Sequence, residues 1–246
     1  MALGVGLRLA RTVEIGKVMK TAGYDFLFID MEHGSMSIDL TAQLSIAAQD
    51  AGITPIVRVP GFEHFHATRA LDAGAQGIVV PHVDTPEVAA RMVANCRYPP
   101  VGHRSVTGAV PQLDFETHPM AEWTKAVDAA TLLILMIESP QAIESIEQIA
   151  AVPGFDALLV GTNDLCIEMG IPGQPEHPRV VDAFERLVAA CRAHGKHAGL
   201  GGVYEPRLIE RYLAMGFRLA LAGNDLPFLL SAARERAALV RAMPLS

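Results

Sequence analysis

Residues 132–140 read LLILMIESP and residues 157–164 read ALLVGTND, and these two stretches decide which fold the chain can adopt. Each begins with a short apolar run, which is typical of a buried strand, and each ends in a carboxylate, at Glu138 and at Asp164. A helix is expected to start at Pro140 and another at Leu165. A buried strand, a polar turn and a helix form the repeating unit of proteins with a parallel sheet.

The same unit recurs along the whole chain. Strands are expected at residues 5–9, 26–30, 55–59, 77–83, 132–137, 157–161, 198–201 and 219–223. Between them, segments such as residues 40–51 and 180–191 carry apolar residues on one helical face, and Asp225 is expected to cap the last helix. Eight strand and helix units in 246 residues indicate a (β/α)₈ barrel. An open, doubly wound sheet is the alternative.

Composition narrows the functional classes. The formal charge of −7 makes nucleic acid an unexpected partner, and three cysteines without CxxC spacing indicate neither a disulfide framework nor a cysteine zinc site. We therefore expect a reducing, cytoplasmic location. Residues 1–10 do not resemble a signal peptide, since Arg8 interrupts their apolar stretch, and no apolar run is long enough to cross a membrane. Residues 97–110 are expected to form a long loop within one domain spanning residues 1–246.

The acidic ends of two neighbouring strands suggest a metal site. Parallel strands would bring Glu138 and Asp164 side by side at the barrel mouth, where two carboxylates repel each other unless a cation lies between them. Carboxylates and water favour a hard divalent ion such as Mg²⁺ or Mn²⁺. The alternative is that both residues only cap the helices that follow them.

Two further strand ends carry groups suited to acid–base and anion chemistry. Arg58 ends the strand at residues 55–59, where an inward guanidinium would bind a carboxylate, an enolate or a phosphate, or would form a structural ion pair with Asp30 or Glu32. His33 follows Asp30 closely and could be a general base held by that carboxylate, although a histidine in a loop often has no such role.

Lysine positions argue against covalent catalysis. The chain has four lysines, Lys17, Lys20, Lys125 and Lys196, and none falls at the carboxyl end of an expected strand. Schiff-base chemistry is therefore not expected. Glycines at residues 199–202 and around residue 223 could form a phosphate site, but glycine turns also serve close packing.

Six motifs together resemble one known family. They are FLFIDMEHGSMS (26–37), PIVRVPG (55–61), ALDAGAQGIVVPHV (70–83), CRYPPVGHRS (96–105), MIESPQAIESI (136–146) and GFDALLVGTNDL (154–165). The chain is similar to the metal-dependent class II pyruvate aldolases of the 4-hydroxy-2-oxo-heptanedioate type, within the aldolase and citrate lyase superfamily. The resemblance implies a (β/α)₈ barrel, a divalent ion (Mg²⁺, Mn²⁺ or Co²⁺) and a homohexamer, built as a trimer of dimers, that exchanges the last helix, residues 225–241.

The resemblance also assigns roles to individual residues. Glu138 and Asp164 match the metal ligands, Arg58 matches the arginine that holds the pyruvate oxygen, and Asp30 and His33 match an aspartate–histidine dyad. Asp72 matches an aspartate that approaches the dyad of a neighbouring subunit. The amides of Gly161, Thr162, Asn163 and Asp164 match the site of the pyruvate carboxylate.

The activity implied is reversible cleavage of a 4-hydroxy-2-oxo acid to pyruvate, or a related 2-oxo acid, and an aldehyde. Met136, Thr162, Asn163, Ser105 and Thr107 depart from the common pattern, which bears on the choice of acceptor. Three alternatives are a lyase for malyl or citramalyl coenzyme A, a phosphate-binding barrel isomerase, and a barrel that binds an oxo acid without catalysis. The chain lacks a basic patch for the coenzyme A phosphates, and a binding protein has no need of a dyad.

Overall fold

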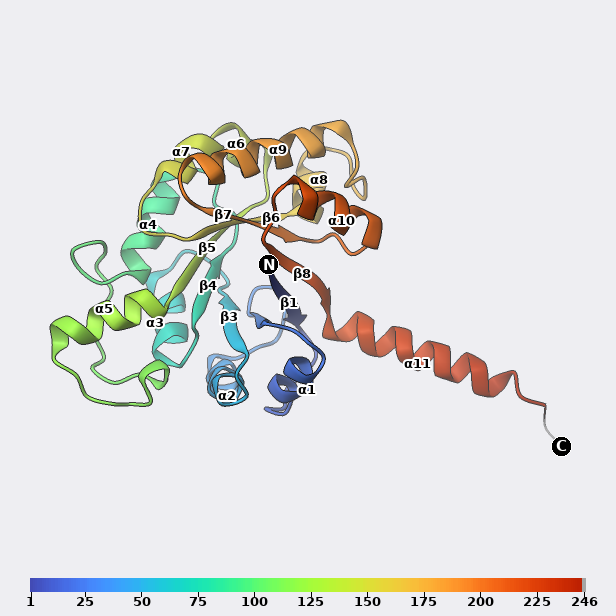
Figure 1. Cartoon of the computed structure of the whole chain (residues 1–246), viewed down its shortest axis with the longest axis horizontal. Helices are drawn as coiled ribbons and strands as arrows, with labels where there is room; N and C mark the ends of the chain where they lie inside the picture. The colour runs from blue at the N-terminus through green and yellow to red at the C-terminus, as the bar shows by residue number, and fades with distance from the viewer. Residues whose placement is uncertain (245–246) are drawn as a thin grey trace.

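The computed structural model describes residues 1–244, and in it eight parallel strands close into a barrel in sequence order (Figure 1). The strands are β1 (Ala2–Leu7), β2 (Phe26–Asp30), β3 (Thr54–Arg58), β4 (Gly77–Val80), β5 (Leu132–Ile137), β6 (Ala157–Gly161), β7 (His197–Gly201) and β8 (Leu219–Asn224). Because β1 pairs with both β2 and β8, the sheet has no free edge. The barrel prediction is confirmed, and the open sheet is excluded.

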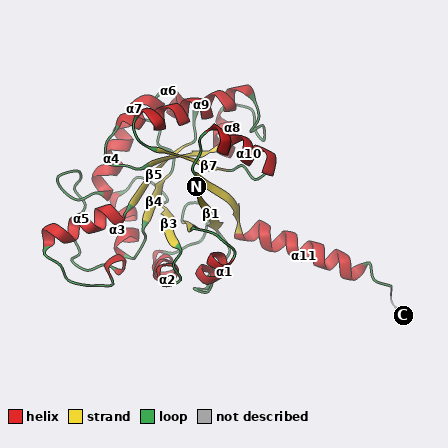
Figure 2. Ribbon diagram, in the orientation of Figure 1, coloured by secondary structure: helices red, strands yellow, loops and turns green. Residues whose placement is uncertain are grey.

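Helices lie around the outside of the barrel, and the last of them extends away from it (Figure 2). They are α1 (Ile15–Thr21), α2 (Ile38–Asp50), α3 (His64–Asp72), α4 (Pro86–Cys96), α5 (Met120–Ala130), α6 (Pro140–Glu144), α7 (Ile146–Ala151), α8 (Thr162–Glu168), α9 (Pro178–Ala193), α10 (Pro206–Met215) and α11 (Asp225–Arg241), with a 3₁₀ turn, η1 (Pro111–Leu113). The expected loop at residues 97–110 contains no helix or strand. Residues 245 and 246, the last two of the expected domain, lie outside the described residues.

Two expected strands differ from those observed by more than one residue. The strand expected at residues 5–9 lies at Ala2–Leu7, because the chain bends at Arg8 to meet Asp225. The strand expected at residues 77–83 ends at Val80: Pro81 has no amide hydrogen for a sheet bond, and His82 adopts a φ of 51°. Both differences fall where strands enter the loops of the barrel mouth.

Alternation along each strand separates an inner layer from an outer one. On β2, Phe26 and Phe28 belong to a small cluster inside the barrel, whereas Leu27 and Ile29 belong to the larger core between strands and helices. On β5, Ile134 and Met136 face inward in the same way. The inward-facing residues that follow the apolar part of each strand therefore lie at the barrel mouth.

The last helix differs from the others in its exposure. Helix α11 extends away from the barrel (Figure 1), and of its residues only Asp225 is buried. Several large apolar side chains on it are 40–60% exposed: Leu226, Phe228, Leu229, Leu230, Leu239 and Val240. Among the described residues, no helix is both long and apolar enough to span a membrane.

Candidate active site at the barrel mouth

The candidate site is built from the inward-facing series that fills the barrel. Asp30 follows Phe28 on β2, Arg58 follows Ile56 on β3, and Glu138 comes two residues after Met136 of β5. Asp30 and Arg58 are also direct partners in the register of β2 with β3. The barrel thus gathers Asp30, Arg58 and Glu138 at one end.

Asp30 and Arg58 form a buried ion pair. Arg58 Nε donates to Asp30 Oδ1 at 3.0 Å and Nη2 donates to Oδ2 at 2.6 Å, a bidentate arrangement between side chains that are almost fully buried. Burial alone would raise the pKa of Asp30, but the hydrogen bonds and charge of Arg58 outweigh it and the pKa is lowered. Asp30 is therefore ionised and fixes the guanidinium in place.

Arg58 has further partners on the other side. Its Nη1 lies 2.9 Å from Glu32 Oε2 and 3.8 Å from Met136 Sδ, and its Cζ lies 5.3 Å from the centre of the Phe28 ring. The structural ion pairs considered for Arg58 are therefore both present. Arg58 also lines the cavity at the barrel mouth, so its ion pairs are compatible with a role in binding.

The expected contact between Asp30 and the His33 imidazole is wrong. Asp30 Oδ1 accepts a hydrogen bond from the main-chain amide of His33 at 3.1 Å, and both of its oxygens are occupied by arginines. The His33 ring is half exposed, and its Nε2 lies 3.8 Å from Glu32 Oε2. Its carboxylate neighbour is thus Glu32, because Asp30 is drawn to Arg58.

Glu138 has the chemistry expected of a cation ligand. Burial, with smaller contributions from the carboxylates of Asp164 and Glu32, raises the pKa of Glu138 to about 7, although the neighbouring His82 acts in the opposite direction. A β-carbon on Gly161 would collide with the Glu138 carboxylate, so glycine is needed there. A divalent cation would relieve the repulsion between Glu138 and Asp164, and the donor set fits one.

These two carboxylates are a small ligand set. Within residues 1–244, no group of three or more histidine, cysteine, aspartate or glutamate side chains is arranged to hold a metal. Mg²⁺ commonly binds through one or two carboxylates and keeps water or substrate as its other ligands. The helix-cap alternative is not observed: the cap of α6 is Ser139, whose hydroxyl accepts from the Ala142 amide, and Asp164 lies inside α8.

The positions predicted to receive the pyruvate carboxylate surround the same space. Gly161 ends β6, Thr162 and Asn163 begin α8, and all three line the mouth cavity together with Asp164. Thr162 is buried and donates its hydroxyl to the carbonyl of Gly201 at 2.6 Å, which ties this turn to β7.

His82 is a site residue to which no role was assigned from the sequence. Its main-chain amide donates to Glu138 Oε2 at 2.9 Å, and its ring lies 3.4 Å from Glu32 and 3.5 Å from Glu138. The left-handed backbone at His82 is costly for a residue with a side chain and turns it toward both acids. Its place directly after Pro81 at a strand end was the available signal.

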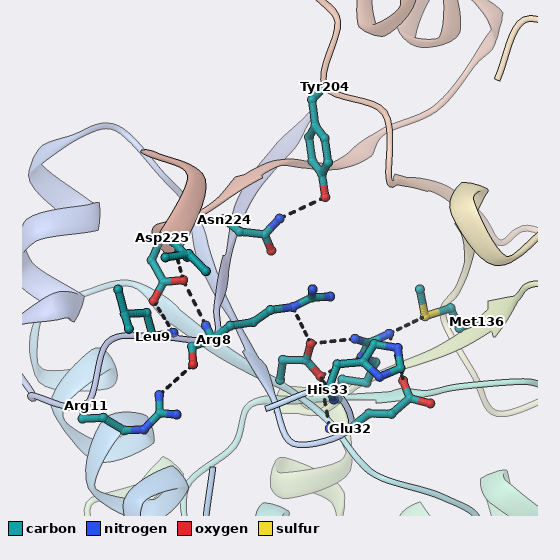
Figure 3. Close-up of polar contacts among 12 residues, drawn as sticks. Arg8, Leu9, Arg11, Glu32, His33, Met136, Tyr204, Asn224 and Asp225 are labelled. Carbon is teal, nitrogen blue, oxygen red and sulfur yellow. Dashed lines mark hydrogen bonds and ion pairs between the residues drawn. The ribbon is translucent and has the colours of Figure 1, made fainter. Parts of the chain in front are cut away.

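Arg8 and Tyr204, which were not expected at the mouth, complete the opposite wall of the cavity together with Asn224 (Figure 3). Arg8 Nε donates to Asp30 Oδ2 at 2.9 Å, and the amide of Asn224 donates to the Tyr204 hydroxyl at 3.0 Å. Arg8 continues the inward series of Gly4 and Gly6, which was the signal for it.

Asp225 is not the N-terminal cap of α11 that was expected. Asn224 occupies the cap position of α11, and the carboxylate of Asp225 accepts hydrogen bonds from the amides of Arg8, Leu9 and Ala10 at 2.7–3.1 Å. It also accepts from Leu226 at 2.8 Å. Asp225 therefore fixes the loop after β1, and with it the position from which Arg8 enters the mouth (Figure 3).

The sequence pattern of the HpcH/HpaI aldolase/citrate lyase family matches residues 9–232. The chain belongs to this family. It is 37% identical to the 4-hydroxy-4-methyl-2-oxoglutarate aldolase of Hapsidospora irregularis, over 98% of this chain and 91% of that protein. It is 34% identical to the hydroxypyruvate/pyruvate aldolase of Cupriavidus necator, over 98% and 89%. The crystal structure of an HpcH/HpaI aldolase from Desulfitobacterium hafniense superposes with a TM-score of 0.93 at 29% identity, covering 99% and 93% of the two chains.

Membership of the HpcH/HpaI family confirms the resemblance drawn from the motifs, while the roles of individual residues stay predictions. Asp72 illustrates the difference. It ends α3, close to the start of β4 and thus at the barrel end away from the mouth, where it accepts a 2.7 Å hydrogen bond from the buried Arg104. Within one chain Asp72 is therefore not part of the mouth site, and a role in a neighbouring subunit's site stays a prediction.

Proposed function

We propose that this HpcH/HpaI family protein is a divalent-metal-dependent aldolase. It would reversibly cleave a 4-hydroxy-2-oxo acid to pyruvate, or a related 2-oxo acid, and a carbonyl acceptor such as an aldehyde. One observation carries the proposal: Arg58 and Asp164 line one mouth cavity, and Glu138 and Asp164 line the space beside it. The names of the relatives, which are aldolases acting on 2-oxo acids, support the same reaction class.

The donor half of the substrate would bind at the ends of β5, β6 and β3. Glu138 and Asp164 would hold a divalent ion, Mg²⁺, Mn²⁺ or Co²⁺, which supplies Lewis acidity toward the 2-oxo group. The amides of residues 161–164 would receive the carboxylate of the 2-oxo acid. Arg58, fixed by Asp30 and Glu32, would donate to the oxygen that gains negative charge as the carbon–carbon bond breaks.

His33 would move the proton of the 4-hydroxyl group. Its half-exposed ring lies beside Glu32, which can orient it. In cleavage His33 would accept the hydroxyl proton, directly or through a water, and in synthesis it would return it. Asp30 would act by positioning the two arginines.

The test measures enolisation and cleavage separately. Exchange of pyruvate methyl protons into deuterated water reports the donor half alone, and release of pyruvate from a 4-hydroxy-2-oxo acid reports the full reaction. Both should disappear with EDTA and return with Mg²⁺, Mn²⁺ or Co²⁺, and borohydride with pyruvate should leave no adduct. Turnover that resists the chelator, or a covalent mass shift on a lysine, would contradict the metal mechanism. Binding of pyruvate without exchange or cleavage would favour the non-catalytic barrel.

We also propose that the protein is a homo-oligomer, a hexamer built as a trimer of dimers, in which α11 packs on another subunit. The exposed apolar side chains of α11 support this, since side chains such as Leu229 and Val240 do not stabilise a helix that remains in water but would stabilise an interface. In such an assembly Asp72 would approach a neighbouring mouth. The cytoplasm remains our prediction for its location, and the three cysteines are free and buried.

A further inference from the structure

The guanidinium of Arg8 lies at the mouth cavity, and most of its N–H donors have no protein acceptor among the described residues. An arginine has five N–H donors, and only Nε of Arg8 has a protein acceptor among residues 1–244, namely Asp30. Its side chain is 44% exposed. In Figure 3 it reaches from the loop beside Asp225 into the space between His33 on one side and Tyr204 with Asn224 on the other.

Arg8 faces the candidate metal ligands across the mouth. In a closed barrel of eight strands in sequence order, β1 and β5 lie on opposite sides. Arg8 directly follows β1, and Glu138 directly follows β5. A substrate whose 2-oxo end binds near Glu138 and Asp164 therefore extends its other end toward Arg8.

The two arginines of the site differ in what they can still bind. Arg58 is buried and holds two carboxylates, Asp30 and Glu32. Arg8 contacts Asp30 through Nε, which leaves both of its terminal amino groups for a second planar anion. A carboxylate matches that fork with two parallel hydrogen bonds.

We propose that Arg8 binds a carboxylate on the acceptor half of the substrate, so that the preferred substrate is a 4-hydroxy-2-oxo dicarboxylate and the acceptor released is itself an oxo acid. This inference rests on the proposed aldolase function. The Tyr204 hydroxyl and the Asn224 amide line the same wall and supply neutral polar contacts beside the anion.

The reaction balances without a further reactant. The bond between C3 and C4 breaks, its electron pair stays on C3, the 4-hydroxyl proton leaves, and C4 becomes the carbonyl carbon of the acceptor. C3 takes up one proton, so that two oxo acids result. The acceptor carboxylate is unchanged, and its contact with Arg8 serves binding and orientation.

The size of the cavity favours a short acceptor. The space lined by Arg8, Arg58 and Tyr204 measures about 70 Å³, well below the range of roughly 300–1,000 Å³ typical of pockets for larger ligands, and residues 161–164 line it too. Because both halves of the substrate would share this small space, a carboxylate attached directly to the reacting carbonyl carbon is favoured over one at the end of a longer chain. We therefore assign the anion to C4 of the substrate.

The experiment compares two substrates that differ in one group. In 4-hydroxy-4-methyl-2-oxoglutarate, C4 carries a carboxylate, and in 4-hydroxy-4-methyl-2-oxopentanoate it carries a methyl group instead. The wild-type kcat/KM should favour the dicarboxylate, and Arg8→Gln should reduce that preference roughly ten- to a hundredfold, as expected for loss of a charged hydrogen-bonding partner. Arg8→Lys should keep part of the preference, since it keeps the charge without the fork.

Arg11→Gln is the matched control. Arg11 lies in the same loop and donates to main-chain carbonyls and Ser35, and it does not line the cavity, so the substrate preference should stay at the wild-type value. A preference that Arg8→Gln leaves unchanged would overturn the inference. So would an Arg8-dependent preference for a third substrate with a terminal phosphate, 2-oxo-3-deoxy-6-phosphogluconate, over the dicarboxylate.

Exchange of pyruvate methyl protons distinguishes failure of the Arg8 proposal from failure of the aldolase proposal. If wild-type protein exchanges pyruvate methyl protons but shows no Arg8-dependent preference, the inference on the acceptor is wrong and the aldolase proposal stands. If wild-type protein neither exchanges these protons nor cleaves any of the three substrates, both are wrong.

Discussion

At the residue scale, Asp30 joins the two arginines of the mouth. Its Oδ2 accepts hydrogen bonds from Arg58 Nη2 and from Arg8 Nε, and its Oδ1 accepts from Arg58 Nε. One buried negative charge thus fixes two positive groups that come from β3 and from the loop after β1. The same aspartate could not also hold the His33 ring, because no lone pair in reach is left for it.

Asp30→Asn tests this role through stability. The change should lower the free energy of unfolding by about 3 kcal/mol at pH 7, because it leaves buried positive charge incompletely paired. The pKa of Asp30 is lowered in the folded protein, so its ionised form contributes stability that is fully present above its usual pKa of 3.8. That contribution is lost as the pH falls through the lower, folded pKa.

Urea unfolding of wild type and Asp30→Asn between pH 3 and pH 7 measures this difference. The gap between the two proteins should be constant near neutral pH and shrink below about pH 4, as the wild-type aspartate becomes protonated. Asp39→Asn, at an exposed position in the first turn of α2, is the control. A gap that does not depend on pH would show that the charge of Asp30 is not what stabilises the mouth.

Substitutions of Glu138 and of Arg58 should impair different steps of the reaction. Glu138→Gln removes one anionic ligand, so calorimetric titration should show weaker metal binding and both exchange and cleavage should fall. Arg58→Ala should bind metal nearly normally while it loses roughly 2.7 to 4 kcal/mol of transition-state stabilisation, about a hundred- to a thousandfold in rate. Arg58→Lys should recover only part of the rate, since a point charge cannot replace the planar fork.

Exchange of pyruvate methyl protons distinguishes the possible roles of Arg58. If Arg58→Ala exchanges them as fast as wild type but does not cleave the aldol, Arg58 serves the acceptor and its assignment to the enolate oxygen is wrong. Thermal melting must accompany these rates, because Arg58→Ala also leaves Asp30 and Glu32 without their shared partner.

At the scale of elements, the mouth depends on a contact between the two ends of the chain. Asp225 begins α11, and its carboxylate receives the amides of residues 8–10 from the loop after β1. Because β1 and β8 are neighbours in the closed barrel, this contact holds the loop where strand and helix meet. The start of α11 therefore belongs to the site, while the rest of the helix extends away from it.

Asp225→Ala should release this loop. We expect faster hydrogen exchange at the amides of Leu9 and Ala10 and a loss of about 2 kcal/mol in unfolding free energy, because partly buried amides lose a charged acceptor. Glu235→Ala, an exposed acid on the same helix, should change neither. Unchanged exchange at residues 8–10 in Asp225→Ala would mean that other contacts hold the loop.

At the scale of the whole molecule, α11 is the feature that a single barrel does not explain. Its first turn contacts the barrel, where Phe228 lies against Gly223 and 6.4 Å from the ring of Tyr24. Beyond that turn its apolar side chains face solvent in one chain. Packing on another copy would remove this apolar area from water.

Leu229→Glu combined with Val240→Glu should therefore weaken the assembly. Each side chain is more than half exposed in one chain, so the substitutions should leave the barrel folded while they weaken association at least tenfold. Sedimentation over a range of concentrations measures this, with Ser231→Glu on another face of the helix as the control. A wild-type protein that sediments as a monomer would rule out the exchanged helix.

The barrel and the groups at its strand ends follow from local patterns in the sequence. Alternation on β2 and β5 fixes which side chains face inward, so the apolar series that ends in Asp30 and Glu138 already places both at the mouth. The same local rule would have found Arg8 after Gly4 and Gly6. The exact residue at which a strand ends is harder to predict from the sequence, as at His82, because the backbone there is set by its contact with Glu138.

Which of these groups bond to one another depends on how the chain folds as a whole. Asp30 lies three residues from His33, yet its side-chain partners come from Arg58 and Arg8, which reach it from neighbouring strands. Asp225 similarly meets the loop at residues 8–10 from more than two hundred residues away. Such pairings depend on barrel closure, which brings strand ends together at distances that local spacing does not encode. A buried carboxylate then takes the strongest donors within reach, and these were the two arginines.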